Sequence, residues 1–133
     1  MAIIVDADVI IRGEKGAFDF QHWLASRPKD HFEIAAITVA ELWHGVERAA
    51  GTHRVRRQLY LQAILAPLPV IPYTEQTAYE HARIWAELEA SGTMIGFYDV
   101  IVAATALERG SEVATFNRKH FVQVRGLTIL EPK

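Results

Sequence analysis

The sequence predicts an α/β protein, a three-layer α/β/α sandwich in which helices cover both faces of a central parallel sheet of about five strands. Short runs rich in β-branched residues alternate with longer segments of helical periodicity along all 133 residues. The first run, from Ala2 to Val5, is apolar throughout, which is typical of a strand buried on both faces. No repeat or linker interrupts this pattern, so we expect residues 1–133 to form a single domain.

Strands are expected at five places in the chain. They span residues 2–5, 32–37, 70–72, 112–115 and 127–130. Prolines beside the third strand place it at an edge of the sheet, because proline has no N–H for the strand ladder. Between the first strand and the first helix, residues 9–16 predict a short apolar turn and a polar loop bounded by glycines.

Helical periodicity is found between the predicted strands. The expected helices span residues 17–27, 38–50, 52–65, 74–91 and 99–107. The last of them is apolar on nearly all sides, so we expect it to lie inside the core and to end at Gly110. Residues 117–121 predict only a short turn.

Composition excludes several classes of protein. The chain has no cysteine, which excludes disulfides, thiolate metal sites and a cysteine nucleophile and fits a reducing cytoplasm. No apolar run approaches the roughly 20 residues that cross a membrane, and no basic leader precedes the first acid. We therefore expect a cytoplasmic protein with no membrane partner. The net charge of −2 argues against binding nucleic acid through bulk charge, unless a bound cation reverses the sign of the site.

Acidic residues recur near the ends of the predicted strands. Asp6 and Asp8 follow the first strand, Glu41 comes soon after the second, and Asp99 opens the buried helix. Because the carboxyl ends of parallel strands form the ligand crevice of such a sheet, we expect these acids to converge there. Mg²⁺ and Mn²⁺ prefer oxygen ligands, and an ion held by carboxylates can bind a phosphate and activate a water for phosphodiester hydrolysis.

Each acid also has a purely structural interpretation. The spacing Thr38-x-x-Glu41 matches a capping box, in which the two side chains satisfy backbone N–H groups at a helix start. Asp99 could merely complement the positive end of its helix dipole, and an Asp after a strand can simply cap the next turn. The recurrence of acids at one edge of the sheet favours a site over three separate coincidences.

Four short motifs, in this order and spacing, resemble those of PIN-domain ribonucleases, and specifically the VapC-type toxins of bacterial and archaeal toxin–antitoxin pairs. The resemblance covers nearly the whole chain, and the motifs are residues 5–10, 38–42 with Gly45, 95–104, and 115–121 with 126–127. It implies that Asp6, Glu41 and Asp99 hold a divalent ion, Mg²⁺ or Mn²⁺. It also implies supporting roles for nearby polar residues, namely Asp8, Thr38, Thr115, Asn117 and His120.

Two of these residues depart from the family's usual pattern. Asp8 stands where the family usually has Asn or Ser, and His120 stands where many relatives have a fourth acid. A neutral imidazole can still ligate a metal or bond its water, but it adds no negative charge. The number of ions that bind together is therefore left open.

The resemblance implies a metal-dependent endoribonuclease that hydrolyses RNA with a metal-activated water and acts as the toxin of a toxin–antitoxin pair. The implied partners are the RNA substrate, a cognate VapB-type antitoxin and a second copy of the chain in a homodimer. Trp43 and Trp85 lie on apolar helix stripes and are candidates for such interfaces.

Basic residues form two groups. Arg118, Lys119 and Arg125 lie near the closing acidic motif, so we expect them to contact the RNA backbone. The second group begins the helix expected at 52–65 and is interpreted as a solvated helix face; it comprises His53, Arg54, Arg56 and Arg57.

Two other functions fit parts of the sequence. Asp6 and Asp8 also resemble the nucleophile and general acid of haloacid dehalogenase-type phosphatases, with Thr38 as a second motif. Such a phosphatase needs an acidic pair after the fourth strand, where this chain has Thr115-Phe116-Asn117. The other alternative is a binding module that keeps the fold without catalysis, which the intact acidic trio argues against.

Overall fold

The computed structural model describes residues 2–133 and contains a five-stranded, wholly parallel sheet with the strand order β3-β2-β1-β4-β5. The strands are β1 (Ala2–Val5), β2 (His31–Ala35), β3 (Val70–Ile71), β4 (Glu112–Ala114) and β5 (Ile129–Leu130). The predicted fold class is confirmed, and β3 lies at an edge of the sheet as the prolines beside it indicated.

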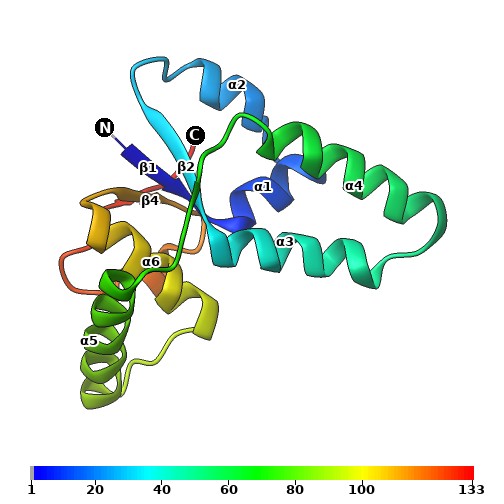
Figure 1. Ribbon diagram of the computed structural model, residues 1–133. Coiled ribbons are helices and arrows are strands. Elements are labelled where there is room, and N and C mark those ends of the chain that lie inside the picture. The colour runs from blue at the N-terminus through cyan, green and yellow to red at the C-terminus, as the bar shows by residue number, and fades with distance from the viewer. Residues whose placement is uncertain (1) are drawn as a thin grey trace.

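The central strand β1 separates two hydrophobic cores. Ile3 and Val5 point to one face of the sheet and Ile4 to the other, and all three are fully buried. The first core packs against α1 (Ala7–Glu14), α2 (Phe20–Ala25), α3 (Ala36–Arg48) and α4 (Gly51–Leu65). The second packs against α5 (Glu75–Ser91), α6 (Phe97–Arg109) and α7 (Arg118–Phe121). Figure 1 shows these two groups of helices on either side of the sheet.

The segment after β1 is helix α1, so the predicted turn and loop at residues 9–16 are wrong. The side chain of Asp6 accepts a hydrogen bond from the backbone N–H of Ala7 and so begins the helix. Val9 and Ile10 are fully buried against the first core. Their burial, about 1.5–3 kcal/mol for each side chain, outweighs the weak helix propensity of β-branched residues.

Other helix boundaries also differ from the prediction. The helix expected at 17–27 is the shorter α2, which begins after Asp19, whose side chain accepts from the backbone N–H of His22. The turn expected at 117–121 contains the four-residue helix α7. By contrast, α5 begins after Thr74 and ends at Gly92, as its sequence predicted.

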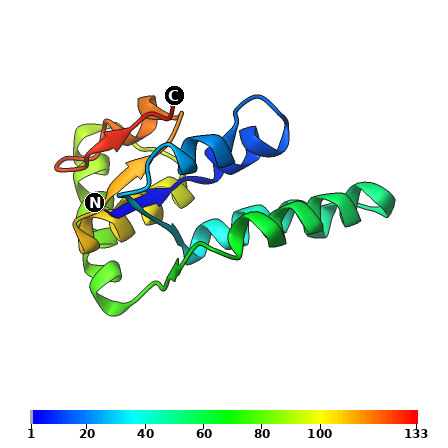
Figure 2. The same ribbon diagram turned by 90° about the horizontal axis from the view of Figure 1, so that it is seen from above.

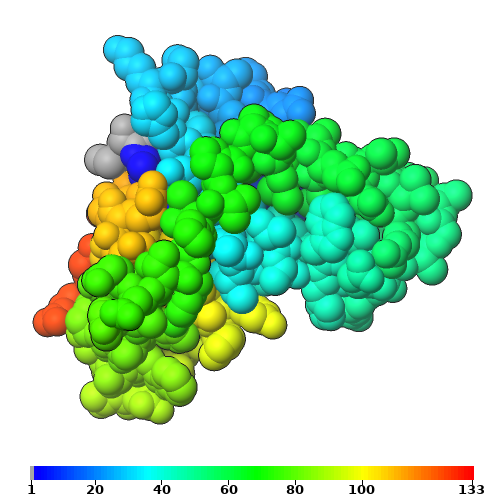
Figure 3. All heavy atoms as spheres, viewed as in Figure 1, coloured from blue at the N-terminus to red at the C-terminus, as the bar shows by residue number. Residues whose placement is uncertain are grey.

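Helices α3 and α4 form an antiparallel pair, here called the α3–α4 arm (residues 36–65). The arm begins at the carboxyl end of β2 and extends away from the sheet (Figures 1 and 2). In the space-filling view it stands out to one side of the body (Figure 3). Within residues 2–133, no helix is both long and apolar enough to cross a bilayer.

Candidate active site

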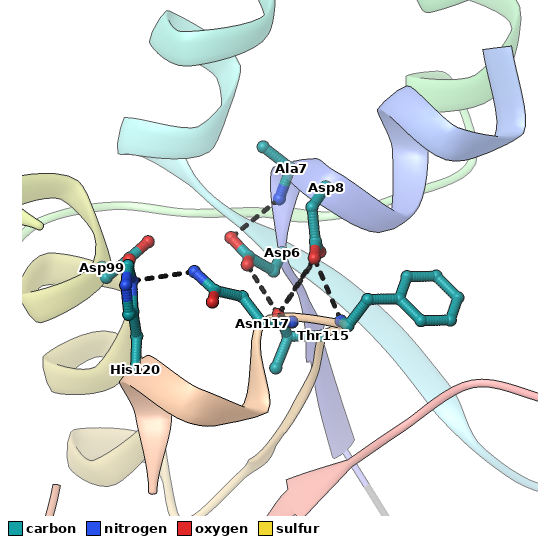
Figure 4. Close-up of polar contacts among 8 residues, drawn as sticks. Asp6, Ala7, Asp8, Asp99, Thr115, Asn117 and His120 are labelled. Carbon is teal, nitrogen blue, oxygen red and sulfur yellow. Dashed lines mark hydrogen bonds and ion pairs between the residues drawn. The ribbon is translucent and has the colours of Figure 1, made fainter. Parts of the chain in front are cut away.

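Asp6 lies at the carboxyl end of the central strand and is only 4% exposed. Its Oδ1 accepts from the backbone N–H of Ala7 at 2.9 Å, and its Oδ2 accepts from the hydroxyl of Thr115 at 2.8 Å (Figure 4). Its own backbone N–H donates to the carbonyl oxygen of Ala114 at 2.9 Å. The ends of β1 and β4 therefore fix this carboxylate jointly, although the two strands are far apart in the sequence.

Asp8 connects α1 to the loop that follows β4. Its Oδ2 accepts from the backbone N–H of Phe116 at 3.0 Å, and its two oxygens lie 3.3 and 3.4 Å from the Thr115 hydroxyl. The hydroxyl has one proton, which the shorter contact assigns to Asp6. The Thr115 oxygen in turn accepts from the backbone N–H of Asn117 at 2.9 Å. Thr115 is thus the junction of the hydrogen-bond network.

Glu41 and Thr38 do not form a capping box. Strand β2 ends at Ala35, which is the N-cap of α3 and makes no side-chain capping bond. Thr38 is consequently the third residue inside the helix, where its side chain cannot cap. Its hydroxyl is buried without a hydrogen-bond partner, as is Oε1 of Glu41. The capping interpretation is wrong, and these side chains need another explanation.

Asp99 is the third residue of α6, and its carboxylate faces α7. Its Oδ2 lies 2.9 Å from Nδ1 of His120, which also lies 2.8 Å from Nδ2 of Asn117 (Figure 4). A protonated Nδ1 donates to the carboxylate and can then pair with Asn117 only through the amide oxygen. The tautomer of His120 and the orientation of the Asn117 amide are therefore set together.

The electrostatics show that the acids lie close enough to repel one another. The pKa of Glu41 is raised to about 7, mainly by burial and also by the negative charges of Asp99 and Asp8. Burial raises the pKa of Asp6 well above its ordinary value, with Asp8, Asp99 and Glu41 adding to the effect against the Thr115 hydrogen bond. Burial also raises the pKa of Asp8. The charged form of each of these three acids is thus disfavoured, and a cation bound between them would stabilise it.

The donor set suits a hard divalent cation. The converging groups offer oxygen atoms, and one of them, Oε1 of Glu41, is buried and unpaired. Within residues 2–133, no three His, Cys, Asp or Glu side chains already form an arrangement that could hold an ion. Asp99 instead faces His120. Ion binding by all three candidate acids therefore requires side-chain movement.

The predicted RNA-binding residues occupy two different environments. Arg118 and Lys119 are exposed on α7, and Lys119 lines a surface hollow together with His120. Arg125 instead donates to Glu87 on α5 at 3.2 Å. Arg118 and Lys119 thus lie on the same short helix as His120, which contacts Asp99, whereas Arg125 is paired with Glu87 of α5.

Arg12 was missed by the sequence reasoning. Its guanidinium lies 4.3 Å from the centroid of the Phe116 ring, and its charge partly offsets the raised pKa of Asp8. The signal was the i, i+4 spacing of Asp8 and Arg12, which only has meaning on a helix. Because this segment was predicted to be a turn, the pair was not recognised.

Comparison with known proteins identifies relatives along nearly the full chain. The family model of the PIN domain matches residues 3–127. Ribonuclease VapC10 of Mycobacterium tuberculosis is 33% identical over 120 residues, covering 90% of this chain and 85% of that protein. Ribonuclease VapC1 of Rickettsia felis is 28% identical over 134 residues, covering 98% and 96%. The crystal structure of DNA-bound VapBC from Salmonella typhimurium aligns with a TM-score of 0.88 at 27% identity, covering 98% and 97%.

These matches leave no place for the haloacid dehalogenase alternative, which also required an acidic pair in the Thr115–Asn117 segment. They agree with the strand order, the position of Asp6 at the end of β1 and the acids that α3 and α6 bring to it. The chain therefore belongs to the PIN-domain family, among its VapC ribonucleases.

Proposed function

We propose that this protein is a divalent-metal-dependent endoribonuclease that acts as the toxin of a toxin–antitoxin pair. The similarity to proteins named VapC ribonucleases supports RNA as the substrate. The observation that carries the metal dependence is Glu41, whose buried, unpaired Oε1 and pKa of about 7 place an uncompensated carboxylate beside Asp6 and Asp99.

In this proposal Asp6, Glu41 and Asp99 would hold Mg²⁺ or Mn²⁺. A bound ion supplies charge for the scissile phosphate and lowers the pKa of a water that serves as nucleophile. The protein keeps Asp6 in place through Ala7 and Thr115, so this carboxylate is pre-oriented before any ligand arrives.

The supporting residues act on the loop between β4 and α7. Asp8 and Thr115 hold this loop against α1, and Asn117 carries the same network to His120. His120 keeps the carboxylate of Asp99 directed toward α7 until an ion competes for it. Thr38, buried in the first turn of α3, offers one further unpaired hydroxyl.

RNA would approach this acidic edge along α7. Arg118 and Lys119 are exposed and can contact phosphates on either side of the scissile bond. Arg125 has a weaker claim, because it must first leave Glu87.

The proposal includes two protein partners and a cytoplasmic location, where RNA is accessible. The aligned VapBC structure supports a VapB-type antitoxin as one partner. Trp85, 46% exposed and lining a surface hollow together with Phe97, supports a homodimer interface on α5 and α6, whereas Trp43 packs against the first core. Light scattering that shows only a monomer across practical concentrations would contradict the homodimer.

The test is hydrolysis of single-stranded RNA by the purified protein with Mg²⁺ or Mn²⁺ and then with excess EDTA. We expect cleavage only with the ion, and no cleavage by Asp99→Asn. Cleavage that persists undiminished in EDTA would contradict the metal dependence. Absence of RNA cleavage under every ion tested would instead favour a catalytically silent PIN-fold module.

A further inference from the structure

The α3–α4 arm carries a basic surface hollow outside the acidic site. The hollow lies between the end of α3 and the start of α4, and it is lined by Gly45, Arg48, Ala49, His53 and Arg57. Within residues 2–133, neither Arg48 nor His53 forms an ion pair. The sequence had suggested a solvated helix face here, but the structure shows a concave site with cationic walls.

The guanidinium of Arg57 lies against Gly45 at the wall of this hollow. A Cβ atom at Gly45 would lie 2.9 Å from Cζ of Arg57, so only glycine lets the guanidinium approach α3 so closely. Glycine inside a helix costs about 1 kcal/mol relative to alanine. The Nε of Arg57 is 3.4 Å from Oε1 of Glu14, yet it is buried without a hydrogen bond. The guanidinium is thus only partly satisfied by the protein.

The hollow and the acidic site lie on the same face of α3. Glu41, Gly45 and Arg48 are spaced i, i+4 and i+7, which places them in one stripe along the helix. With a rise of 1.5 Å per residue, Arg48 lies about 10 Å beyond Glu41 along the helix axis. A chain of negative charges that starts at the acidic site can therefore continue along this stripe into the hollow.

The charges of α4 are also unfavourable for the helix itself. Its first turn contains His53 and Arg54 and no acidic residue, and its N-cap, Ala50, makes no side-chain capping bond. Cations at this end oppose the helix dipole. Arg54 has partial compensation through Glu47 at 3.3 Å, whereas Arg56 has no ion pair among residues 2–133. The protein thus concentrates positive charge at a helix end where the helix dipole disfavours it.

We propose that the hollow on the α3–α4 arm, through Arg48 and Arg57, binds backbone phosphates of the RNA next to the scissile phosphodiester. The proposal rests on the ribonuclease function proposed above and assigns a substrate contact to residues outside the acidic site. Arg48 and Arg57 are binding residues in this account, and the reacting phosphate stays with Asp6, Glu41 and Asp99.

The test compares two matched variants of the full-length protein, Arg48→Gln and Lys29→Gln. Both positions are exposed and lack an ion pair within residues 2–133. Lys29, however, lies before the amino end of β2, whereas α3 and its hollow follow the carboxyl end of this strand. For a labelled single-stranded oligoribonucleotide with Mg²⁺, we expect Arg48→Gln to raise KM about three- to tenfold with a smaller change in kcat. The slope of log KM against log salt concentration should become shallower by about 0.7 per lost phosphate contact on a single strand. Lys29→Gln should match the wild type in KM and in this slope.

A second pair of variants separates binding from folding. Arg57→Lys keeps the charge and should retain part of the RNA affinity, whereas Arg57→Gln should lose it, with circular dichroism and thermal melting used to verify folding. RNA affinity measured in EDTA isolates these effects from catalysis. If the wild type cleaves RNA but Arg48→Gln matches Lys29→Gln in KM, affinity and salt slope, the hollow is not an RNA site, although the proposed function stands. A loss of affinity for a VapB-type antitoxin, with RNA affinity unchanged, would also overturn the proposal in favour of a protein partner. If the wild type neither binds nor cleaves RNA, the proposed function itself fails and this inference fails with it.

Discussion

Two groups of carboxylates in this protein differ in how their charge is balanced. On the surface of α5, Arg83 donates to Glu80 at 2.7 Å and to Glu87 at 2.8 Å, and Arg125 also pairs with Glu87. The hydrogen bond from Arg83 holds the pKa of Glu87 below its ordinary value. At the carboxyl edge of the sheet, by contrast, burial raises the pKa values of Asp6, Asp8 and Glu41.

This difference in charge balance distinguishes the acids of α5 from the acids at the carboxyl end of the sheet. The α5 acids are compensated by cations of the same chain, which is the usual state of surface charges. In the described part of the chain, no Lys or Arg forms an ion pair with Asp6, Asp8 or Glu41 at the carboxyl end of the sheet. Charges that the fold leaves unbalanced, at a cost to its own stability, are available to a cation from outside.

The largest expected effect comes from Glu41→Gln, which removes one unbalanced charge at nearly constant shape. We expect the rate of RNA hydrolysis at ordinary Mg²⁺ to fall at least about a hundredfold, because a displaced phosphate or water loses its reactive position. The mutant should fold normally. Glu87→Gln removes a carboxylate from the balanced group and should cleave RNA like the wild type. Near-equal rates for Glu41→Gln and Glu87→Gln would show that the two groups of acids do not differ in function.

The next effect concerns stabilisation by metal. Because an ion that binds the native state and not the unfolded chain raises stability, Mg²⁺ or Mn²⁺ should raise the melting temperature. Asp99→Asn should weaken this response, since it removes a charged ligand and leaves the fold of α6 intact. Differential scanning calorimetry with and without Mn²⁺ measures the response. Equal shifts in wild type and mutant would remove Asp99 from the ligand set.

The pH dependence of the metal-free protein gives a smaller effect of definite sign. Glu41 has a pKa of about 7 in the fold against an ordinary value of 4.5, so the native state binds more protons than the unfolded chain between these values. Stability should therefore fall as pH rises from about 4.5 through about 7 and then level off, and the raised pKa of Asp6 acts in the same direction. Urea unfolding in EDTA across this range measures the trend, which Glu41→Gln should flatten. A rise in stability with pH that survives in the mutant would contradict this assignment.

The smallest effect is expected for Asp8→Asn. An amide oxygen can still accept from the backbone N–H of Phe116, and the substitution removes a charge that repels Asp6 and Glu41. The free energy of unfolding should change by less than about 1 kcal/mol. Asp8→Ala leaves the N–H of Phe116 without its acceptor and should destabilise the protein more. Thermal melts that rank the two variants in the opposite order would show that Asp8 does not hold this loop.

The layers of the fold and the position of the acids followed from the sequence, because buried parallel strands alternate with helices and acids recur after the strands. Helix α1 was not predicted. Its β-branched residues and Gly13 have weak helix propensity. The helix is stabilised instead by the burial of Val9 and Ile10 in the first core. The cation–π contact of Arg12 with Phe116 was missed for the same reason, since it joins segments that only the fold brings together.

The role of Thr38 and Glu41 also could not be decided from sequence. A capping box and a ligand pair have the same spacing, and the choice depends on whether the helix begins before or after Thr38. Hydrogen bonds between strands end at Ala35, so the helix begins two residues before Thr38. A boundary shift of this size lies within the uncertainty of any sequence pattern, yet here it decides whether Thr38 and Glu41 can form a capping box.

The most direct test of the account is calorimetric titration of the metal-free protein with Mn²⁺. If the acids at the carboxyl end of the sheet bind a cation, the wild type and Glu87→Gln should bind Mn²⁺ with the same affinity. Glu41→Gln should then bind at least about tenfold more weakly, equivalent to about 1.4 kcal/mol. Binding by Glu41→Gln as tight as by the wild type, or loss of binding in Glu87→Gln instead, would contradict the account.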